Sequence, residues 1–374
     1  MRAPCQFLGV LSRRAPVVAV VSAALCFSAI RFFVLVDRYS VNVLYWDQWD
    51  YYIALFAERG VWELFRLQHG PHRQGLGSLL SAFIAETSGW NTRAETFAIA
   101  VVLCLTAVAG LILKCRTIGP LEWTDVILPV LFLTPPQWEV FANTPNPAHG
   151  AVPLLLVILS CHAWTIRCRP LRYAVVLVLN FAAIHTGFGM LLGVITPLVL
   201  AADLVRDLGE RDRKGLGMAV GGLAVAGLSA GIFFTGYVFD PAIEGFRFPD
   251  PEIYRYPQMM ALAQFLPVRG IATETLVGMC LLTALVAVAI VHARGLFSSD
   301  EAQRHRSRII LILALSCVLF VANLAIGRVS LGSAAQFSRY VPLLLPGVLA
   351  LYFHATTQAQ TPPTRVAAWI ITRF

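Results

Sequence analysis

The chain has 374 residues, of which 57% are hydrophobic and only 13% are charged. A soluble domain carries about 25% charged residues, so this composition excludes an ordinary soluble protein and predicts a polytopic protein of membrane-spanning helices. The net charge of +8 comes mainly from basic residues at the ends of apolar runs, so it does not indicate nucleic-acid binding.

The first apolar run, residues 17–36, follows an N-terminal segment that contains three arginines. The run is too long for a signal peptide and has no cleavage site, so we expect a retained first helix. Each further run of about 20 apolar residues predicts another span. These runs lie near residues 94–113, 122–138, 148–166, 173–185, 187–204, 216–237, 271–293, 309–327 and 340–355. The sequence therefore predicts a single all-α transmembrane domain over residues 1–374, a helical bundle with about 10 or 11 transmembrane helices.

Basic residues cluster between some of these runs, and such clusters mark the cytoplasmic side of a membrane protein. The clusters lie at residues 114–116, 167–172, 206–214 and 294–308. We therefore expect a multi-pass protein of the plasma (inner) membrane with both termini in the cytoplasm. The segments expected on the outer side are residues 37–74, 135–149, 237–270 and 327–339.

The same rule settles two ambiguous stretches. Residues 173–202 have basic flanks on both sides, so we expect a helical hairpin that breaks at the glycines of residues 185–189. Residues 37–73 are outside and Lys114 is inside, so the helix at 94–113 supplies the one crossing that is needed. Residues 75–90 are then expected to form a short or re-entrant helix.

The first outer loop, residues 37–74, contains the most informative stretch of the chain. Asp47 and Asp50 lie among five aromatic side chains within residues 45–52, and aromatic residues favour the membrane interface. Apolar residues then recur at helical spacing, which predicts interfacial helices. A carboxylate at this boundary can act as a general base toward a hydroxyl, so we expect Asp47 and Asp50 to be catalytic.

His69, His72 and Arg73 follow in the same loop and are candidate substrate-binding residues. Histidine and arginine can stabilise a phosphate group, arginine through two parallel hydrogen bonds. The alternative is a structural role, in which Asp50 and Arg73 form loop salt bridges and the histidines lie at the interface.

Three later segments carry further candidates. Glu139 is a lone acid in the second outer loop and is a candidate second active-site acid, although it could be a solvated loop residue. His185 lies at the hairpin break, and an ionisable group inside a membrane is a functional candidate by default. Arg339 and Tyr340 open the last helix from outside, where the arginine could hold a lipid phosphate.

The order of these motifs resembles the GT-C superfamily of membrane glycosyltransferases, such as the protein O-mannosyltransferases and the aminoarabinose transferases of lipid A. The resemblance covers about residues 15–215: one helix, an outer loop with an early Asp, interfacial helix, a short helix and a second outer loop with an acid. Asp47 matches the first-loop acid, and Glu139 falls near the place of the second. The family's common Asp-Glu pair is interrupted, with its second acid displaced to Asp50. Residues 185–186 read His-Thr where the family often has a Lys before the Gly.

The resemblance implies an inverting enzyme that moves a hexose or pentose from a polyprenyl-phosphate carrier to an envelope lipid, glycan or protein on the outer face. Asp47 would deprotonate or hydrogen-bond the acceptor hydroxyl, and Arg73, Arg339 or His72 would hold the leaving lipid phosphate. Membrane lipids are the other expected partners. Metal dependence varies among such enzymes, and the sequence has no ligand cluster strong enough to assign a divalent metal.

Two other functions stay open. A transporter or flippase for a lipid-linked glycan would favour repeated halves and charged residues deep in several helices, but no repeat is visible and charged residues in the middle of the spans are scarce. An assembly or polymerase subunit for envelope polysaccharide would favour a large outer loop, but the longest predicted outer loop is the 38-residue segment 37–74. No Walker A, HExxH or GxSxG motif occurs, so the energy for any reaction would come from a substrate presented in the membrane.

Overall fold

The computed structural model describes residues 5–45, 47–142, 146–239, 261–266, 268, 270–327 and 338–359. Within these residues the chain forms an all-α bundle, and the strands found there are two pieces of two residues each. The outer segments predicted at residues 237–270 and 327–339 fall largely outside the described residues.

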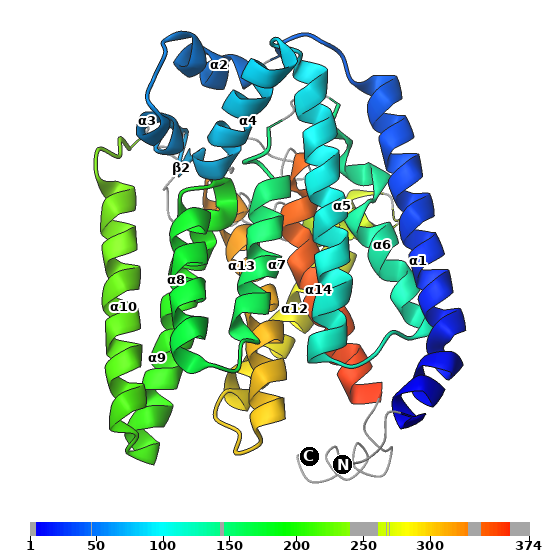
Figure 1. The fold of residues 1–374 in the computed structure, drawn as a ribbon, viewed down its shortest axis with the longest axis vertical. Helices are drawn as coiled ribbons and strands as arrows, with labels where there is room; N and C mark the ends of the chain where they lie inside the picture. The colour runs from blue at the N-terminus through cyan, green and yellow to red at the C-terminus, as the bar shows by residue number, and fades with distance from the viewer. Residues whose placement is uncertain are drawn as a thin grey trace.

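Long helices lie side by side along the bundle (Figure 1). They are α1 (Cys5–Tyr39), α5 (Thr92–Thr117), α7 (Ala151–Trp164), α8 (Arg169–Ile184), α9 (Leu192–Glu210), α10 (Arg213–Phe234), α12 (Ile271–Gly295), α13 (Glu301–Gly327) and α14 (Val341–Ala359). In the described part of the chain, seven helical segments are long and apolar enough to cross a membrane, and α7 is a shorter apolar helix. The predicted membrane bundle is therefore confirmed.

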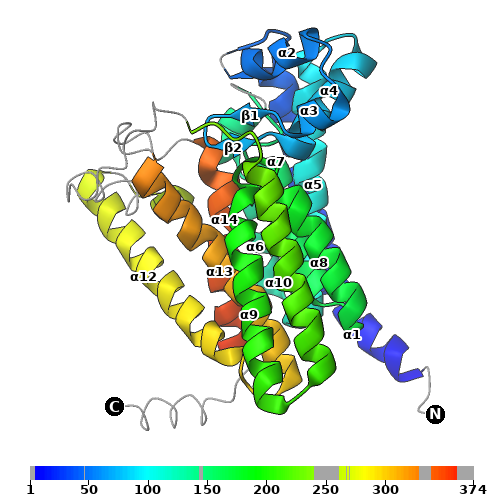
Figure 2. The ribbon, with the colours of Figure 1, turned by 90° about the vertical axis from the view of Figure 1, so that its left-hand side faces the viewer.

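The centre of the bundle is α7, which packs against α5, α8, α13 and α14. Nearly all of its side chains are buried, as expected of a helix that is apolar on every side. Figure 2 shows α8, α9 and α10 together as one group and α12, α13 and α14 as another. The N-terminus of α7 therefore carries the second predicted outer loop into the middle of one end of the bundle.

That end of the bundle carries short elements of the first predicted outer loop, and we call it the capped end (Figures 1 and 2). These elements are α2 (Gln48–Phe56), α3 (Val61–Phe65), β1 (Gln68–His69), β2 (His72–Arg73) and α4 (Gly75–Ser88). In α2 and α3, five apolar side chains expose half or more of their surface: Trp49, Ile53, Phe56, Val61 and Trp62. These are the exposed apolar faces that helices lying in a membrane interface present to lipid.

The two ambiguous stretches form the elements that the charge pattern predicted. Residues 75–90 contain the 14-residue α4, which lies at the capped end beside α3 and does not run along the bundle (Figure 1). The hairpin of α8 and α9 breaks after Ile184, and a short 3-10 helix, η3 (Gly187–Leu191), joins the two helices. Gly187 has a φ of +53°, and a Cβ there would collide with the carbonyl oxygen of Ala148. The glycine therefore lets the second loop approach the hairpin break.

The span expected at residues 122–138 differs from the structure. It is divided into η1 (Trp123–Val126), α6 (Ile127–Phe132) and η2 (Pro135–Val140). The proline pair at residues 135–136 explains the break, because proline disfavours a helical residue before it and cannot donate a backbone hydrogen bond. Two further 3-10 helices are η5 (Ala261–Phe265) and η7 (Ser338–Tyr340), and η7 leads into α14 at the capped end.

Candidate functional site

Asp47 lies at the start of α2, where three distant parts of the chain meet at the capped end. Its Oδ2 atom is 3.6 Å from Nη1 of Arg339 and 3.9 Å from Nε2 of His69. The Asp47 side chain is 18% exposed, so it is screened from bulk water but can still be reached by a substrate. We call Asp47, Asp50, His69, His149 and Arg339 the Asp47 cluster.

The two acids of α2 both face His69. Asp50 lies one helical turn after Asp47, and residues three apart share a helix face. Oδ2 of Asp50 is 3.2 Å from Nδ1 of His69. A proton on Nδ1 that bonds to Asp50 leaves the lone pair of Nε2 directed toward Asp47. The predicted loop bridge of Asp50 is therefore made with His69 rather than with Arg73.

The β-hairpin sorts the candidate residues of the first loop onto two faces. Gln68 pairs with Arg73 across the hairpin, and His69 pairs with His72. Successive strand residues point to opposite sides, so the two histidines share one face while Gln68 and Arg73 share the other. The histidine face meets His149, whose ring centroid is 5.9 Å from that of His69 and 5.4 Å from that of His72.

Arg73 lies on the face away from the Asp47 cluster and is 2% exposed. Its guanidinium donates to the carbonyl oxygens of Phe233 at 2.8 Å and Thr235 at 2.9 Å, and also to that of Arg66. The first two carbonyls belong to the C-terminal end of α10, where backbone acceptors lack partners within the helix and a cation is favoured. Burial and the neighbouring Arg66 lower the pKa of Arg73. The structure thus places this candidate phosphate ligand as a helix cap.

His149 belongs to the cluster, although the pattern of the sequence did not single it out. It lies just before α7, and its Nε2 atom is 3.3 Å from the hydroxyl of Tyr51. That hydroxyl also accepts a hydrogen bond from Asn146, which donates to Gln74 at 3.3 Å as well. Burial, and then the charge of Asp47, raise the pKa of Tyr51 well above its ordinary value. The signal in the sequence that could have identified His149 is its position in a polar loop directly before an apolar helix.

Glu139 reaches the cluster through the backbone of Arg339. Its Oε2 atom accepts the Arg339 backbone N–H at 3.0 Å, and its own backbone N–H donates to Oγ of Ser338 at 2.9 Å. Tyr340 is buried, and its ring meets the edge of the Phe188 ring. Of the two candidates at the start of the last helix, Arg339 faces Asp47 and Tyr340 packs in the core.

Glu95, in the first turn of α5, is a second buried acid that the sequence analysis missed. Its carboxylate accepts hydrogen bonds from Gln48 at 3.3 Å, from Tyr52 at 3.4 Å and from Ser81. These residues belong to α2 and α4, so one carboxylate fastens both elements to the bundle. An acid inside an otherwise apolar span is the signal that could have found it.

His185 is fully buried at the hairpin break and lies outside the Asp47 cluster. Its Nδ1 atom is 2.9 Å from the carbonyl oxygen of Phe181. Its ring stacks on Phe65, with the centroids 5.2 Å apart. These contacts are those of a packing residue that joins α3 to α8.

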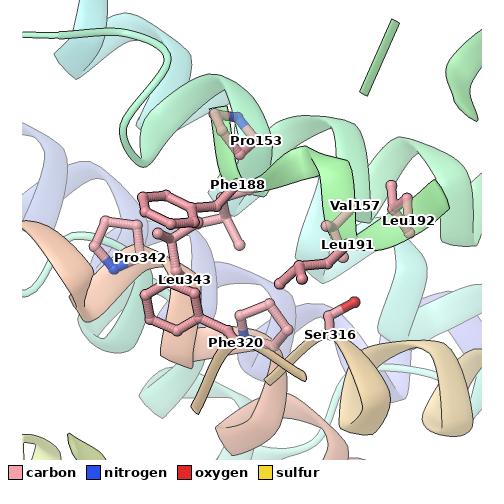
Figure 3. Close-up of a pocket in the computed structure, with 11 residues that line it drawn as sticks. Pro153, Val157, Phe188, Leu191, Leu192, Ser316, Phe320, Pro342 and Leu343 are labelled. Atoms are coloured by element: carbon pink, nitrogen blue, oxygen red, sulfur yellow. The ribbon is translucent and has the colours of Figure 1, made fainter. Parts of the chain in front are cut away.

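Two cavities have linings outside the Asp47 cluster. An apolar cavity of about 20 Å³ lies between α7, η3, α13 and α14 (Figure 3), which is about the space of one water molecule and too little for a sugar. Phe188, Phe320 and Pro342 are among the residues that line it (Figure 3). A cavity of about 600 Å³ lies on the Arg73 side of the hairpin, and its lining includes Arg59 and Arg66. This larger cavity has the size and charge to admit an anionic group.

One part of the cluster has metal-ligand geometry. A carboxylate oxygen of Asp47 and one ring nitrogen each of His69 and His149 all lie within 4.8 Å of one another. Asp47 therefore has around it both the groups that bind a cation and, in Arg339, a group that binds an anion.

No protein-family model, curated protein or solved structure matches this chain.

Proposed function

We propose that this protein is an inverting glycosyltransferase, which moves a sugar from a polyprenyl-phosphate carrier to an acceptor of the cell envelope. The observation that carries the proposal is the contact of Asp47 with Arg339, with Oδ2 and Nη1 3.6 Å apart at the capped end of the bundle. Transfer from a lipid phosphate needs a base for the acceptor and a cation for the leaving group in one place.

In the proposed reaction, a carboxylate oxygen of Asp47 takes the proton of an acceptor hydroxyl. The acceptor oxygen forms a bond to the anomeric carbon while the bond from that carbon to the carrier phosphate breaks, with inversion. Arg339 receives the phosphate that leaves, through charge-assisted hydrogen bonds. The proton then passes from Asp47 to solvent or to the released phosphate.

The position of the cluster supports a substrate that stays in the membrane. The exposed apolar side chains of α2 and α3 lie at the same end of the bundle as Asp47. The turns α5–α6, α7–α8, α9–α10 and α12–α13 lie at the opposite end, and the basic clusters lie in these turns or in the helix ends beside them (Figures 1 and 2). By the positive-inside rule, the capped end would face the outer side of the plasma membrane, where carrier-linked sugars are used.

Charged groups elsewhere favour an enzyme over a flippase. The buried pairs Lys114–Asp125 and Arg308–Asp203 have short N···O distances, 2.7 Å and 2.6 Å. Both pairs join residues near helix ends away from the capped end, and a transporter would instead place such groups near the middle of the membrane.

The test is a transfer assay with purified protein in lipid nanodiscs, radiolabelled polyprenyl-phosphate sugars and membrane extract as acceptor. We expect Asp47→Asn to lower transfer at least about 100-fold, the usual effect of a lost general base. Asp37→Asn is the matched control, because Asp37 is an exposed acid paired with Arg93, and it should transfer like the wild type. Equal transfer by Asp47→Asn would remove Asp47 as the base. No transfer by folded wild type from any donor would favour a flippase or an assembly subunit.

A further inference from the structure

Three ligand-type atoms converge within the Asp47 cluster, one each from Asp47, His69 and His149. The 3.9 Å between Oδ2 of Asp47 and Nε2 of His69 is too long for a hydrogen bond. Two ligands of one tetrahedral ion, with bonds of about 2.1 Å, lie about 3.4 Å apart, so small side-chain rotations would bring these atoms onto one ion. We propose that Asp47, His69 and His149 bind a divalent transition-metal ion of the zinc class.

The donor set decides the class of metal. Two imidazoles with one carboxylate suit zinc and neighbouring transition metals, whereas calcium and magnesium prefer a shell of oxygen atoms. Three protein ligands leave a coordination position open, as catalytic zinc sites do. The side chains of Asp47 and His69 are 18% and 21% exposed, so water or a substrate oxygen can reach that position.

Neighbouring residues hold both histidines as a metal site requires. A metal-binding histidine usually donates its second N–H to a carboxylate or carbonyl, which fixes the ring and the tautomer. Asp50 is placed for this, 3.2 Å from Nδ1 of His69, while Nε2 is the nitrogen that faces Asp47. The ring of His149 is held by the hydroxyl of Tyr51 at 3.3 Å.

A bound ion would also change the net charge of the cluster. Asp47 and Asp50 are acids and Arg339 is the cation beside them, so these three side chains together carry one net negative charge. A divalent ion makes it positive and places a second positive charge beside Arg339, where an anionic leaving group can be held. This role rests on the proposed transferase function, but the binding of the ion does not.

The test measures metal binding directly. Purified full-length protein, stripped with a chelator, is titrated with Zn²⁺ by calorimetry, and retained metal is measured by elemental analysis. We expect about one zinc ion per chain and visible absorption typical of tetrahedral Co²⁺ when cobalt replaces zinc. His69→Gln and His149→Gln should abolish both signals, and Asp50→Asn should weaken affinity about 10- to 100-fold.

Controls separate loss of the site from loss of the fold. His305→Gln changes a histidine on α13 that pairs with Glu301 and should bind zinc like the wild type. His69→Cys keeps a zinc ligand and should restore binding. The proposal is overturned if wild type retains no metal, or if His69→Gln and His149→Gln bind as tightly as wild type. Zinc binding without transfer would sink only the transferase, and zinc-independent transfer without zinc binding would sink only this site.

Discussion

The carboxylate of Glu139 holds the backbone N–H of Arg339 at 3.0 Å, while the guanidinium of the same arginine reaches Asp47 at 3.6 Å. The backbone N–H of Glu139 also donates a hydrogen bond to the hydroxyl of Ser338, the residue before Arg339. Glu139 is therefore placed to position Arg339, whereas the sequence predicted a second active-site acid.

This relationship predicts different effects for two substitutions of Glu139. Glu139→Gln keeps an oxygen that can accept the Arg339 N–H, so its rate of transfer should stay within about threefold of wild type. Glu139→Ala loses the acceptor, and the KM for the lipid-linked donor should rise about tenfold, with a smaller change in kcat. Steady-state kinetics of the two variants check this. If Glu139→Gln were as inactive as Glu139→Ala, Glu139 would be a proton donor or acceptor in the reaction.

Arg73 and Arg339 should separate stability from donor binding. Arg73→Met removes the donor to the Phe233 carbonyl and one of the two donors to the Thr235 carbonyl, which Arg66 also bonds, so we expect the free energy of unfolding to fall by about 1–3 kcal/mol, with the donor KM unchanged in the folded fraction. Arg339→Met should raise the donor KM about tenfold or more with little effect on stability. Thermal unfolding in detergent and steady-state kinetics give the two readouts. A raised donor KM in Arg73→Met, at unchanged stability, would restore Arg73 as a phosphate ligand.

Glu95 should matter for the order of the whole capped end. Glu95→Ala leaves Gln48, Tyr52 and Ser81 without their shared acceptor, and we expect the free energy of unfolding to fall by about 2–4 kcal/mol. Limited proteolysis should then cleave α2 and α3 faster. Glu86→Ala is the matched control, because Glu86 is an exposed acid on α4 and its loss should change neither measurement. Unchanged proteolysis of Glu95→Ala would mean that lipid, not Glu95, orders these helices.

Alkaline pH should destabilise the capped end. Burial, followed by nearby acids, raises the pKa of Tyr51 and of Tyr52 above the ordinary value of 10.0. The folded protein keeps these phenolic protons at a pH where the unfolded chain releases them. The stability they contribute is therefore complete below about pH 10 and is lost as the pH rises further. Melting temperatures measured between about pH 8 and 11 should fall less steeply for Tyr51→Phe than for wild type. Tyr39→Phe, at an exposed tyrosine, should follow the wild-type curve.

Much of the fold could be predicted because the membrane imposes simple rules. Apolar run length and basic clusters located the long helices, the hairpin break before Gly187 and the short helix at residues 75–88. The interrupted stretch from Trp123 to Val140 could not be predicted from hydropathy, because a six-residue helix between two 3-10 turns has the same average hydropathy as a span. The proline pair at residues 135–136 was the local signal for that interruption.

The candidate site could be predicted only in part. Asp47, Asp50, His69 and Arg339 are brought together as candidates of one site, although they come from separate segments. His149 was missed because its importance depends on a tertiary contact that no local spacing encodes. The side chain of Arg73 points away from the Asp47 cluster because residues alternate between the two faces of a strand. This could not be predicted, because strands of two residues are too short to recognise in the sequence.

The β-hairpin also limits how this part of the gene can change. His69 and His72 lie on the face of the hairpin toward the Asp47 cluster, whereas Gln68 and Arg73 lie on the other face and bond to the C-terminal end of α10 and the residues after it. A shift of one residue in a strand exchanges its two faces. A single inserted or deleted codon that shifts one strand within residues 68–73 would therefore exchange the faces of that strand's two residues, and so turn its histidine away from the Asp47 cluster. This segment should tolerate changes of residue far better than changes of length, so an epitope tag belongs elsewhere.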